Sequence, residues 1–216
     1  MLTNRRCNYL FTDMKTNVKD YTDLEILDRV KSLPSCIKTK ALPQYLVVGI
    51  RSNEDEPNKF DDKIYLFING QFCLVTSCTT NAGTPSLLGG YKKYNSKGAA
   101  VIKSDEIYYD AFQKSDGKKV PHHSGKMQCL RQIKSIKYYR DGNNNSKIDE
   151  VGEIELANNS TNIHFNNYDL TTKLIGQVIG GWSAGCQVLN IGEDYNKLLE
   201  LIPYEIKVTY ALLKEF

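Results

Sequence analysis

The chain has little net charge and no cysteine pattern that is typical of a metal site or a disulfide framework. Among its 216 residues, 28 Lys and Arg oppose 25 Asp and Glu, which gives a formal charge of +3. This balance, without a basic stripe, argues against a nucleic-acid partner. No CxxC pair or zinc-like spacing occurs, so we expect reduced cysteines, no metal and no cofactor. The six cysteines are Cys7, Cys36, Cys73, Cys78, Cys129 and Cys186.

Long apolar runs are also missing. The run YLVVGI at 45–50 is among the longest, and it is far too short to cross a bilayer, so we expect no membrane insertion. The first residues, MLTNRRCNYLFTDMKTN, have neither the apolar core nor the small-residue cleavage site of a secretory signal. We therefore expect synthesis in the cytoplasm without a signal peptide.

Length and composition suit one compact domain with an extension. The first forty residues hold one predicted amphipathic helix, over 22–34, that should brace the domain. Thr22 is placed to cap the N-terminus of this helix, and Glu25, three residues later, would complete a capping box. Pro34 would end the helix. We expect residues 1–40 to form a helical extension and 41–216 the main domain. The apolar positions at helical spacing are Leu24, Leu27, Val30 and Leu33.

From Tyr45 onward the pattern is typical of β-structure. Short β-branched or aromatic runs are separated by Gly, Asn and Asp, and Asn69-Gly70 predicts a hairpin turn. A short helix is expected over 191–202, followed by a closing strand at 204–213. We expect a mainly β fold with a few helices (α+β) and mostly antiparallel strands. The predicted strands are 45–50, 63–68, 71–76, 99–103, 136–140, 153–157 and 162–165, and in the closing strand Ile206, Val208 and Tyr210 should share a face.

The most informative stretch is GWSAGCQVL, which ends a glycine-rich turn with a cysteine. Gly180 and Gly181 allow the backbone to reverse, and Gly185 permits a positive φ or a close approach. Cys186 would then be exposed at the head of an apolar run, with free amides nearby to hold an oxyanion. The alternative is an ordinary buried cysteine, because free cysteine is among the most buried residue types.

A histidine lies 22 positions before this cysteine, in NIHF. Strand alternation puts Asn162 and His164 on one face and Ile163 and Phe165 on the other. If the apolar face packs inward, His164 points into a groove where Cys186 must also lie. The imidazole would then hold the thiolate and later protonate a leaving amine, with a backbone carbonyl fixing its tautomer.

Two neighbouring features belong to this predicted groove. Residues 165–181 are long enough to form a flap over it. Trp182 is expected to pack against the turn, with a role in the substrate wall as the alternative.

The stretch DGNNNSKIDEVGE has polar residues at alternate positions, as a calcium loop does. Ser146 stands at the sixth position, where such a loop needs Gly, and Gly152 stands at the twelfth, where it needs Glu. We therefore expect a structural, metal-independent hairpin rich in Asn, with calcium binding as the alternative. The alternating residues are Asp141, Asn143, Asn145 and Asp149.

The order of His164 followed by Ser183-X-Gly185-Cys186 resembles the L,D-transpeptidase catalytic domain of the YkuD type. Ala184 stands where that family usually has a second histidine, and Val188 where it has Arg or Asn. The form SxGCQ is more similar to a divergent phage-associated branch. PNKFDDKIYLF, TNAGTP, KGAAVIKSDEIYYDAF, HHSGKMQCLRQ, KYYRDGNNNSKID and NIHF are similar to that branch in the same order, so the resemblance covers roughly 45–202.

The resemblance implies a mixed β-sheet or sandwich with a catalytic groove, in a cysteine catalytic domain at 41–216. It implies a peptidoglycan-acting peptidase or acyltransferase in which Cys186 attacks the carbonyl of an L-centre that is joined to a D-amino acid. The amides of Ala184, Gly185 and Cys186 would stabilise the oxyanion. The remaining substrate-binding residues would be Ser183, Trp182 and His123.

Hydrolysis of stem peptides, as by an L,D-carboxypeptidase or a phage endolysin, is expected over transpeptidation. Such an enzyme would reach the cell wall after lysis or delivery, with virion or lysis partners of unknown kind. The competing interpretation is an inactive virion or wall-binding protein that keeps the fold, because Ala184 and Val188 depart from the motif.

Overall fold

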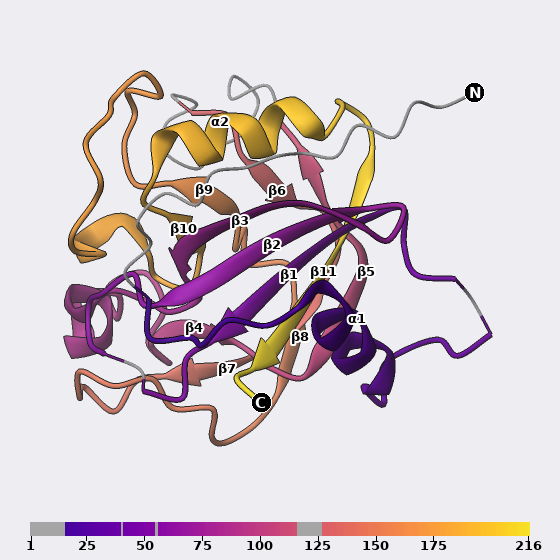
Figure 1. The fold of residues 1–216 in the computed structure, drawn as a ribbon. Helices are drawn as coiled ribbons and strands as arrows, with labels where there is room; N and C mark the ends of the chain where they lie inside the picture. Colours follow the sequence, from indigo (N-terminus) through magenta and orange to yellow (C-terminus); the bar gives the residue numbers. More distant parts are fainter. Residues whose placement is uncertain (1–15, 40, 55, 116–126) are drawn as a thin grey trace, which may run out of the picture.

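The computed structural model describes residues 16–39, 41–54, 56–115 and 127–216. Within these residues the chain is mainly β, with a closed barrel of eight strands, a separate sheet of three strands and two α-helices (Figure 1). Two shorter helical turns are η1 (Ser86–Gly90) and η3 (Gly180–Trp182). The expected α+β class is confirmed.

The barrel strands follow the order β1-β11-β5-β6-β9-β10-β3-β2. The pairs β1/β11 and β9/β10 are parallel, and the other neighbours are antiparallel. The strands are mixed and mostly antiparallel as expected, but they close into a barrel because the last strand pairs with the first. Their bounds are β1 (Tyr45–Arg51), β2 (Asp62–Ile68), β3 (Gln71–Thr79), β5 (Glu106–Lys114), β6 (Leu130–Gln132), β9 (Ile163–Phe165), β10 (Gln187–Leu189) and β11 (Lys207–Lys214).

The small sheet is antiparallel and has the order β4 (Ala99–Ile102), β7 (Ile136–Asp141), β8 (Glu155–Ala157). A buried ion pair between Arg51 at the end of β1 and Glu150 ties the barrel to the chain that follows β7. Arg51 also donates to the carbonyls of Thr80 and Ile102. These bonds fix the small sheet, and β4 with it, against one end of the barrel.

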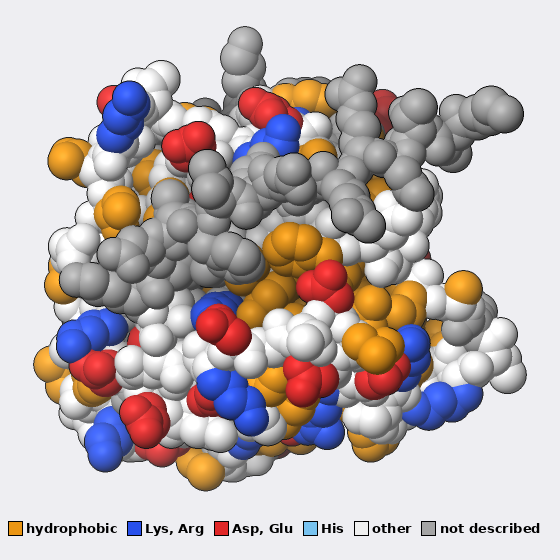
Figure 2. Space-filling model, in the orientation of Figure 1, with side chains coloured by type: hydrophobic (Ala, Val, Ile, Leu, Met, Phe, Trp, Pro, Cys, Tyr) orange, Lys and Arg blue, Asp and Glu red, His pale blue; other side chains and the backbone are white. Residues whose placement is uncertain are grey.

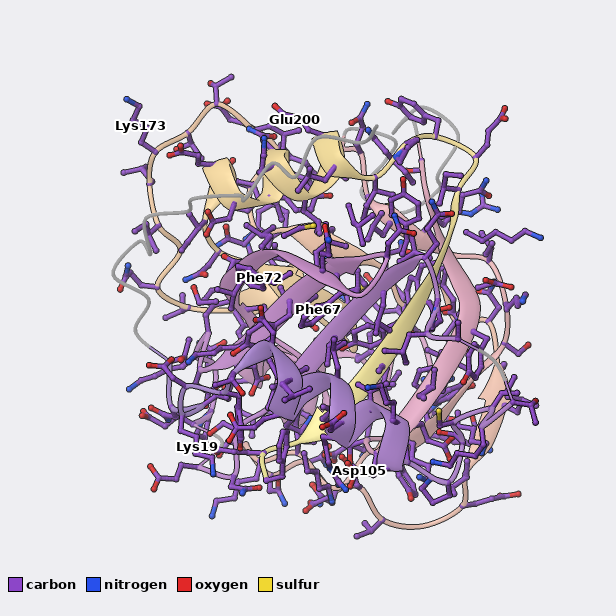
Figure 3. All side chains as sticks on the ribbon, turned by 45° about the vertical axis from the view of Figure 1, so that its right-hand side comes forward. Lys19, Phe67, Phe72, Asp105, Lys173 and Glu200 are labelled. Carbon is purple, nitrogen blue, oxygen red and sulfur yellow. The ribbon has the colours of Figure 1, made fainter. Side chains whose placement is uncertain are left out.

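Alternation along the strands separates the barrel interior from its outer face. Val47 on β1 and Leu66 on β2 belong to the interior core, whereas Val48 and Phe67 belong to a second cluster outside. Figure 3 shows Phe67 beside Phe72 at the β2–β3 hairpin, where the ring centroids are 6.2 Å apart. The expected turn connects these strands, with φ 52 at Asn69.

The helix α1 (Asp23–Ser32) packs on the outer cluster beside β1 and β11 (Figure 1). The predicted capping box of Thr22 and Glu25 is present. Ile26 and Val30 are fully buried, and each such side chain contributes roughly 1.5–3 kcal/mol, which holds a helix that would be marginal alone. Leu24 was expected on this face but is 65% exposed, because the buried stripe starts at Ile26.

The helix α2 (Gly192–Leu201) follows β10 and lies across one end of the barrel, as Figure 1 shows. Tyr195 and Leu198 enter the interior core from this helix. In the closing strand β11, Val208 and Tyr210 are also in that core, whereas Ile206 lies just before the strand. Neither described α-helix is long and apolar enough to span a membrane.

Three strands were not predicted, namely β5, β6 and β10. β6 and β10 have only three residues each, and each is a strand through its pairing with neighbours that are distant in the sequence. On the face that Figure 2 shows, Lys and Arg are interspersed with Asp and Glu, and neither sign forms a continuous patch.

Candidate active site around Cys186

The glycine turn before Cys186 has the backbone geometry that its residues indicate. Gly180 has φ +55 and Gly185 has φ +133, a region that residues with a side chain rarely adopt. A Cβ on Gly185 would lie 2.5 Å from the carbonyl oxygen of Ala100. Gly185 is therefore needed both for its conformation and for the close approach of β4, and the expectation for this residue is confirmed.

Hydrogen bonds within the turn involve Ser183, which is fully buried. Its hydroxyl donates to the carbonyl of Cys186 at 2.8 Å and accepts the N–H of Gly185 at 3.1 Å. In this conformation Ser183 shapes the turn and has no exposed surface for a substrate. The Gly185 amide, expected to be free for an oxyanion, is already engaged.

The turn is also held from outside by the chain between β3 and β4. The carbonyl of Ser183 accepts from the N–H of Gly83 at 3.0 Å and from the hydroxyl of Ser86 at 3.1 Å. The carbonyl of Ala184 accepts from the N–H of Ala100 at 3.0 Å. Hydrogen bonds to the backbone carbonyls of the turn, from residues about a hundred positions earlier, thus set the position of the cysteine.

Gln187 anchors the other side of the turn in the barrel interior. Its Nε2 donates to the carbonyl of Gly185 at 3.1 Å, and its Oε1 accepts from the Tyr210 hydroxyl at 2.7 Å. Gly49 leaves the room that this hydroxyl needs, since a Cβ there would lie 2.3 Å from it. In the sequence, Gln187 is only part of the motif that carries the resemblance. Its anchoring role could not be predicted there, because the role depends on Tyr210 in β11.

The parallel pairing of β9 and β10 puts the thiol and the imidazole on one side of the barrel wall. His164 pairs with Val188, and Cys186 precedes Val188 by two residues, so both side chains lie on the outer face. Ile163 and Phe165 point into the interior core, as alternation predicted. Cys186, one residue before β10, and His164 in β9 are thus diagonal neighbours across the two paired strands.

The tautomer of His164 follows from its backbone contact. Its Nδ1 lies 2.8 Å from the carbonyl oxygen of Phe165, and the ring is fully buried. A carbonyl can only accept, so Nδ1 carries a proton, and in the neutral form of the ring the lone pair is on Nε2. The backbone carbonyl expected to orient the imidazole is therefore that of Phe165.

Cys186 itself is 5% exposed. Its sulfur accepts the N–H of Asn162 at 3.4 Å and lies 3.9 Å from the carbonyl oxygen of Ser160. Burial raises the pKa of the thiol to about 12, against the opposing effect of the Asn162 N–H. A resting thiolate was expected, but with this pKa the group is a thiol at neutral pH.

Apolar side chains surround the thiol. Phe60, Ile179 and Val188 form one buried cluster with Cys186, and the half-buried Trp182 packs against it. Trp182 also meets Tyr168 edge to face, with ring centroids 5.0 Å apart. The expected packing of Trp182 against the turn is confirmed.

Residues 166–181, which we call the covering segment, run from β9 to the turn. Asn58 holds the end of this segment, because its carbonyl accepts the N–H of Ile179 at 3.0 Å and its Oδ1 accepts the N–H of Gly180 at 2.7 Å. Farther back, Asn190 bonds Gly176 through both backbone and side chain.

The outer side of the covering segment is exposed. Lys173 projects away from the barrel in Figure 3. Its neighbours include the exposed apolar side chains Leu174, Ile175 and Val178.

Two other predictions concern residues distant in sequence from this turn. His123 lies outside the described residues. In the Asn-rich loop, Asn145 donates to Asp149 at 3.1 Å, and the N–H of Asp149 donates to Asp141 at 3.0 Å. Burial raises the pKa of Asp141. Across the described ranges, no group of three or more His, Cys, Asp or Glu residues could hold a metal ion.

No protein-family model, no curated protein and no solved structure matches this chain. The resemblance to L,D-transpeptidases therefore rests on the residues themselves, above all His164, Ser183, Gly185 and Cys186. The five cysteines that the structure describes form no disulfide bond with one another.

Proposed function

We propose that this chain is a peptidoglycan-acting cysteine enzyme with an L,D-transpeptidase-like catalytic domain. It cleaves stem peptides at the bond between an L-centre and a D-amino acid through a thioester on Cys186. The observation that supports this most directly is the pairing of β9 with β10, which puts Cys186 and His164 on one face. The hydrogen bond from Nδ1 of His164 to the carbonyl of Phe165 also supports it, because this bond leaves Nε2 as the basic nitrogen of the ring.

In the proposed reaction, Nε2 of His164 removes the thiol proton as Sγ of Cys186 attacks the carbonyl carbon. The C=O π pair moves to the oxygen, and a tetrahedral oxyanion forms. When the C=O bond re-forms, the C–N bond breaks and the imidazolium protonates the departing amine. Water or an acceptor amine then attacks the thioester by the same route and releases the thiol. Trp182, Ala184 and His123 are the substrate-side residues that the resemblance implies, whereas Ser183 and Gly185, which it also implies, instead hold the turn through their mutual hydrogen bond.

Access to Cys186 requires the covering segment to move. The thiol is 5% exposed beneath Phe60 and Ile179, and a peptide cannot reach it in this conformation. The bonds that Asn58 makes to Ile179 and Gly180 are the closest ties that would have to open. Opening would also hydrate the thiol and lower its pKa toward the ordinary range.

Hydrolysis is the proposed outcome, which makes the protein an L,D-carboxypeptidase or endopeptidase of lytic type. Ala184 and Val188 replace groups that would help to hold an acceptor amine. We propose that it is made in the cytoplasm and acts on the wall after lysis or delivery, as a phage-associated enzyme would.

The deciding experiment is intact-mass analysis after incubation with purified muropeptides or a carbapenem. We expect one covalent adduct that Cys186→Ala abolishes and Cys129→Ala, at another buried thiol, retains. From tetrapeptide muropeptides we expect tripeptide and free D-amino acid. New L-centre cross-links or exchange of D-amino acids would instead show a transferase.

A second candidate is an inactive wall-binding or virion protein with the same fold. The burial of Cys186 and the raised pKa of its thiol favour it. Co-sedimentation with insoluble peptidoglycan, without any adduct and unchanged in Cys186→Ala, would establish this alternative.

A further inference from the structure

The site lacks one oxyanion donor that its sequence indicates. An acyl-transfer site stabilises the tetrahedral oxygen with preorganised N–H groups. The Gly185 N–H donates instead to the Ser183 hydroxyl, and that hydroxyl also holds the Cys186 carbonyl. Freeing the Gly185 amide would break up the turn that positions the thiol. A second hydrogen-bond donor near the sulfur could stabilise the oxyanion without disturbing the turn.

Asn162 lies directly against the sulfur. Its backbone N–H donates to Sγ of Cys186 at 3.4 Å, and its carbonyl accepts the N–H of Gln187 at 2.9 Å. Alternation puts its side chain on the same strand face as His164. The main chain of Asn162 therefore adjoins Cys186, and its side chain lies on the strand face of His164.

The carboxamide of Asn162 is fully buried and oriented. Its Oδ1 accepts the N–H of Gln132 at 3.0 Å, which identifies the other end as nitrogen. In the described part of the chain, this Nδ2 has no hydrogen-bond partner. A buried donor without an acceptor is uncommon in folded proteins and calls for a ligand or a functional explanation.

We propose that Asn162 is a catalytic residue whose Nδ2 donates to the oxyanion formed when Cys186 attacks a carbonyl. As Sγ bonds to carbon, the C=O pair moves to the oxygen, and this oxygen becomes the acceptor that Nδ2 lacks. The bond is made only in the tetrahedral state, so it stabilises the transition state over the ground state. The proposal rests on the proposed cysteine chemistry but is independent of which peptide is cleaved.

Asn159 offers a matched control. Its Nδ2 is also buried without a partner, and its Oδ1 accepts from Arg140 at 3.1 Å. Asn159→Ala therefore removes the same kind of group as Asn162→Ala, three residues earlier. None of its recorded bonds involves Cys186.

The test compares two reactions of the same thiol. Acylation by p-nitrophenyl acetate forms an oxyanion, whereas alkylation by iodoacetamide at a saturated carbon does not. Both rates are measured by intact mass in wild type, Asn162→Ala and Asn159→Ala, with Cys186→Ala to identify the modified residue. We expect Asn162→Ala to lower the ratio of acylation to alkylation by about 100-fold, the scale for losing one oxyanion donor, and Asn159→Ala to leave it unchanged.

Asn162→Asp covers the case in which Asn162→Ala does not fold, since it keeps the shape and the acceptor for Gln132 and puts a charged carboxylate oxygen in place of the donor. Its ratio should fall to a similar extent. Equal loss of both rates would show a purely structural residue and overturn the proposal, as would an unchanged ratio or no acetylation of Cys186. Muropeptide turnover is measured separately. Acetylation of Cys186 that depends on Asn162, without muropeptide turnover, would contradict the proposed substrate but would still support the role of Asn162.

Discussion

The turn before Cys186 and the Asn-rich loop after β7 are both irregular, but they are held in opposite ways. The turn is bonded to Gly83, Ser86 and Ala100, far away in the sequence, and its residues Ser183 and Cys186 are buried. The loop is bonded mostly to itself and lies at the surface.

Within the loop, the N–H of Asn145 donates to Asn143, that of Lys147 donates to Asn145, and that of Asp149 donates to Asp141. Such Asn and Asp turns need only their own residues. A self-contained loop should tolerate changes that a turn held by tertiary contacts cannot. The predictions below test this contrast, starting with the largest expected effect.

Alkylation of Cys186 should depend steeply on pH, because only the thiolate reacts. With the thiol pKa raised to about 12, the thiolate fraction grows throughout the range from pH 7 to 10. We expect the iodoacetamide rate at Cys186 to rise about tenfold per pH unit, roughly a thousandfold in all, without levelling off. Peptide mapping at each pH measures this. A plateau near neutral pH would mean that the thiol is already ionised at rest.

The same maps should show the half-buried Cys36 modified before Cys186 at pH 7, among the described cysteines. A thiolate at Cys186 at rest would instead make Cys186 the first of them to be modified.

Gly185→Ala should destabilise the protein by about 3 kcal/mol, since it adds backbone strain at φ +133 to a clash with the Ala100 carbonyl. Urea denaturation measures the loss. Gly152→Ala is the control near the Asn-rich loop, because it also has a positive φ but open space around it. It should cost only about 1 kcal/mol. Equal losses would show that the close approach of β4 contributes nothing.

His164→Ala should lower muropeptide turnover by about 100-fold, the scale for losing a general base. Steady-state assays measure this, and a melting curve checks that the variant folds. Unchanged turnover would remove His164 from the mechanism and make His123→Ala the next variant to examine.

Asn58→Gly should loosen the covering segment by removing the bond to Gly180. Gly accepts the φ of 65 at this position, so the backbone stays unstrained. Losing a bond of about 1 kcal/mol should raise the alkylation rate of Cys186 about fivefold. Asn144→Gly, at φ 62 in the Asn-rich loop, should leave that rate unchanged. Equal alkylation rates in the two variants would show that the Asn58 side chain does not hold the covering segment in place.

Calcium should have the smallest effect. The sixth and twelfth positions of the loop are Ser146 and Gly152, and Asn145 already satisfies Asp149. We expect millimolar calcium to shift the melting temperature by less than about 1 °C. A large saturable rise that Asp141→Ala removes would contradict this and establish a calcium site.

Local patterns determined the features that need only neighbouring residues. The capping box at Thr22, the hairpin turn at Asn69 and the alternation around His164 could all be predicted, because caps, turns and strand faces depend on residues within a few positions. The need for a flexible residue at Gly185 was also visible from the sequence.

Tertiary structure decided what those residues can do. The closure of the barrel, the burial that raises the pKa of Cys186, and the partners of Gln187 and Asn162 all depend on strands that are distant in the sequence. β10 is three residues long and is a strand only because β9 and β3 flank it. Solvation and hydrogen bonding between distant strands depend on which segments meet in space, and no local pattern records that.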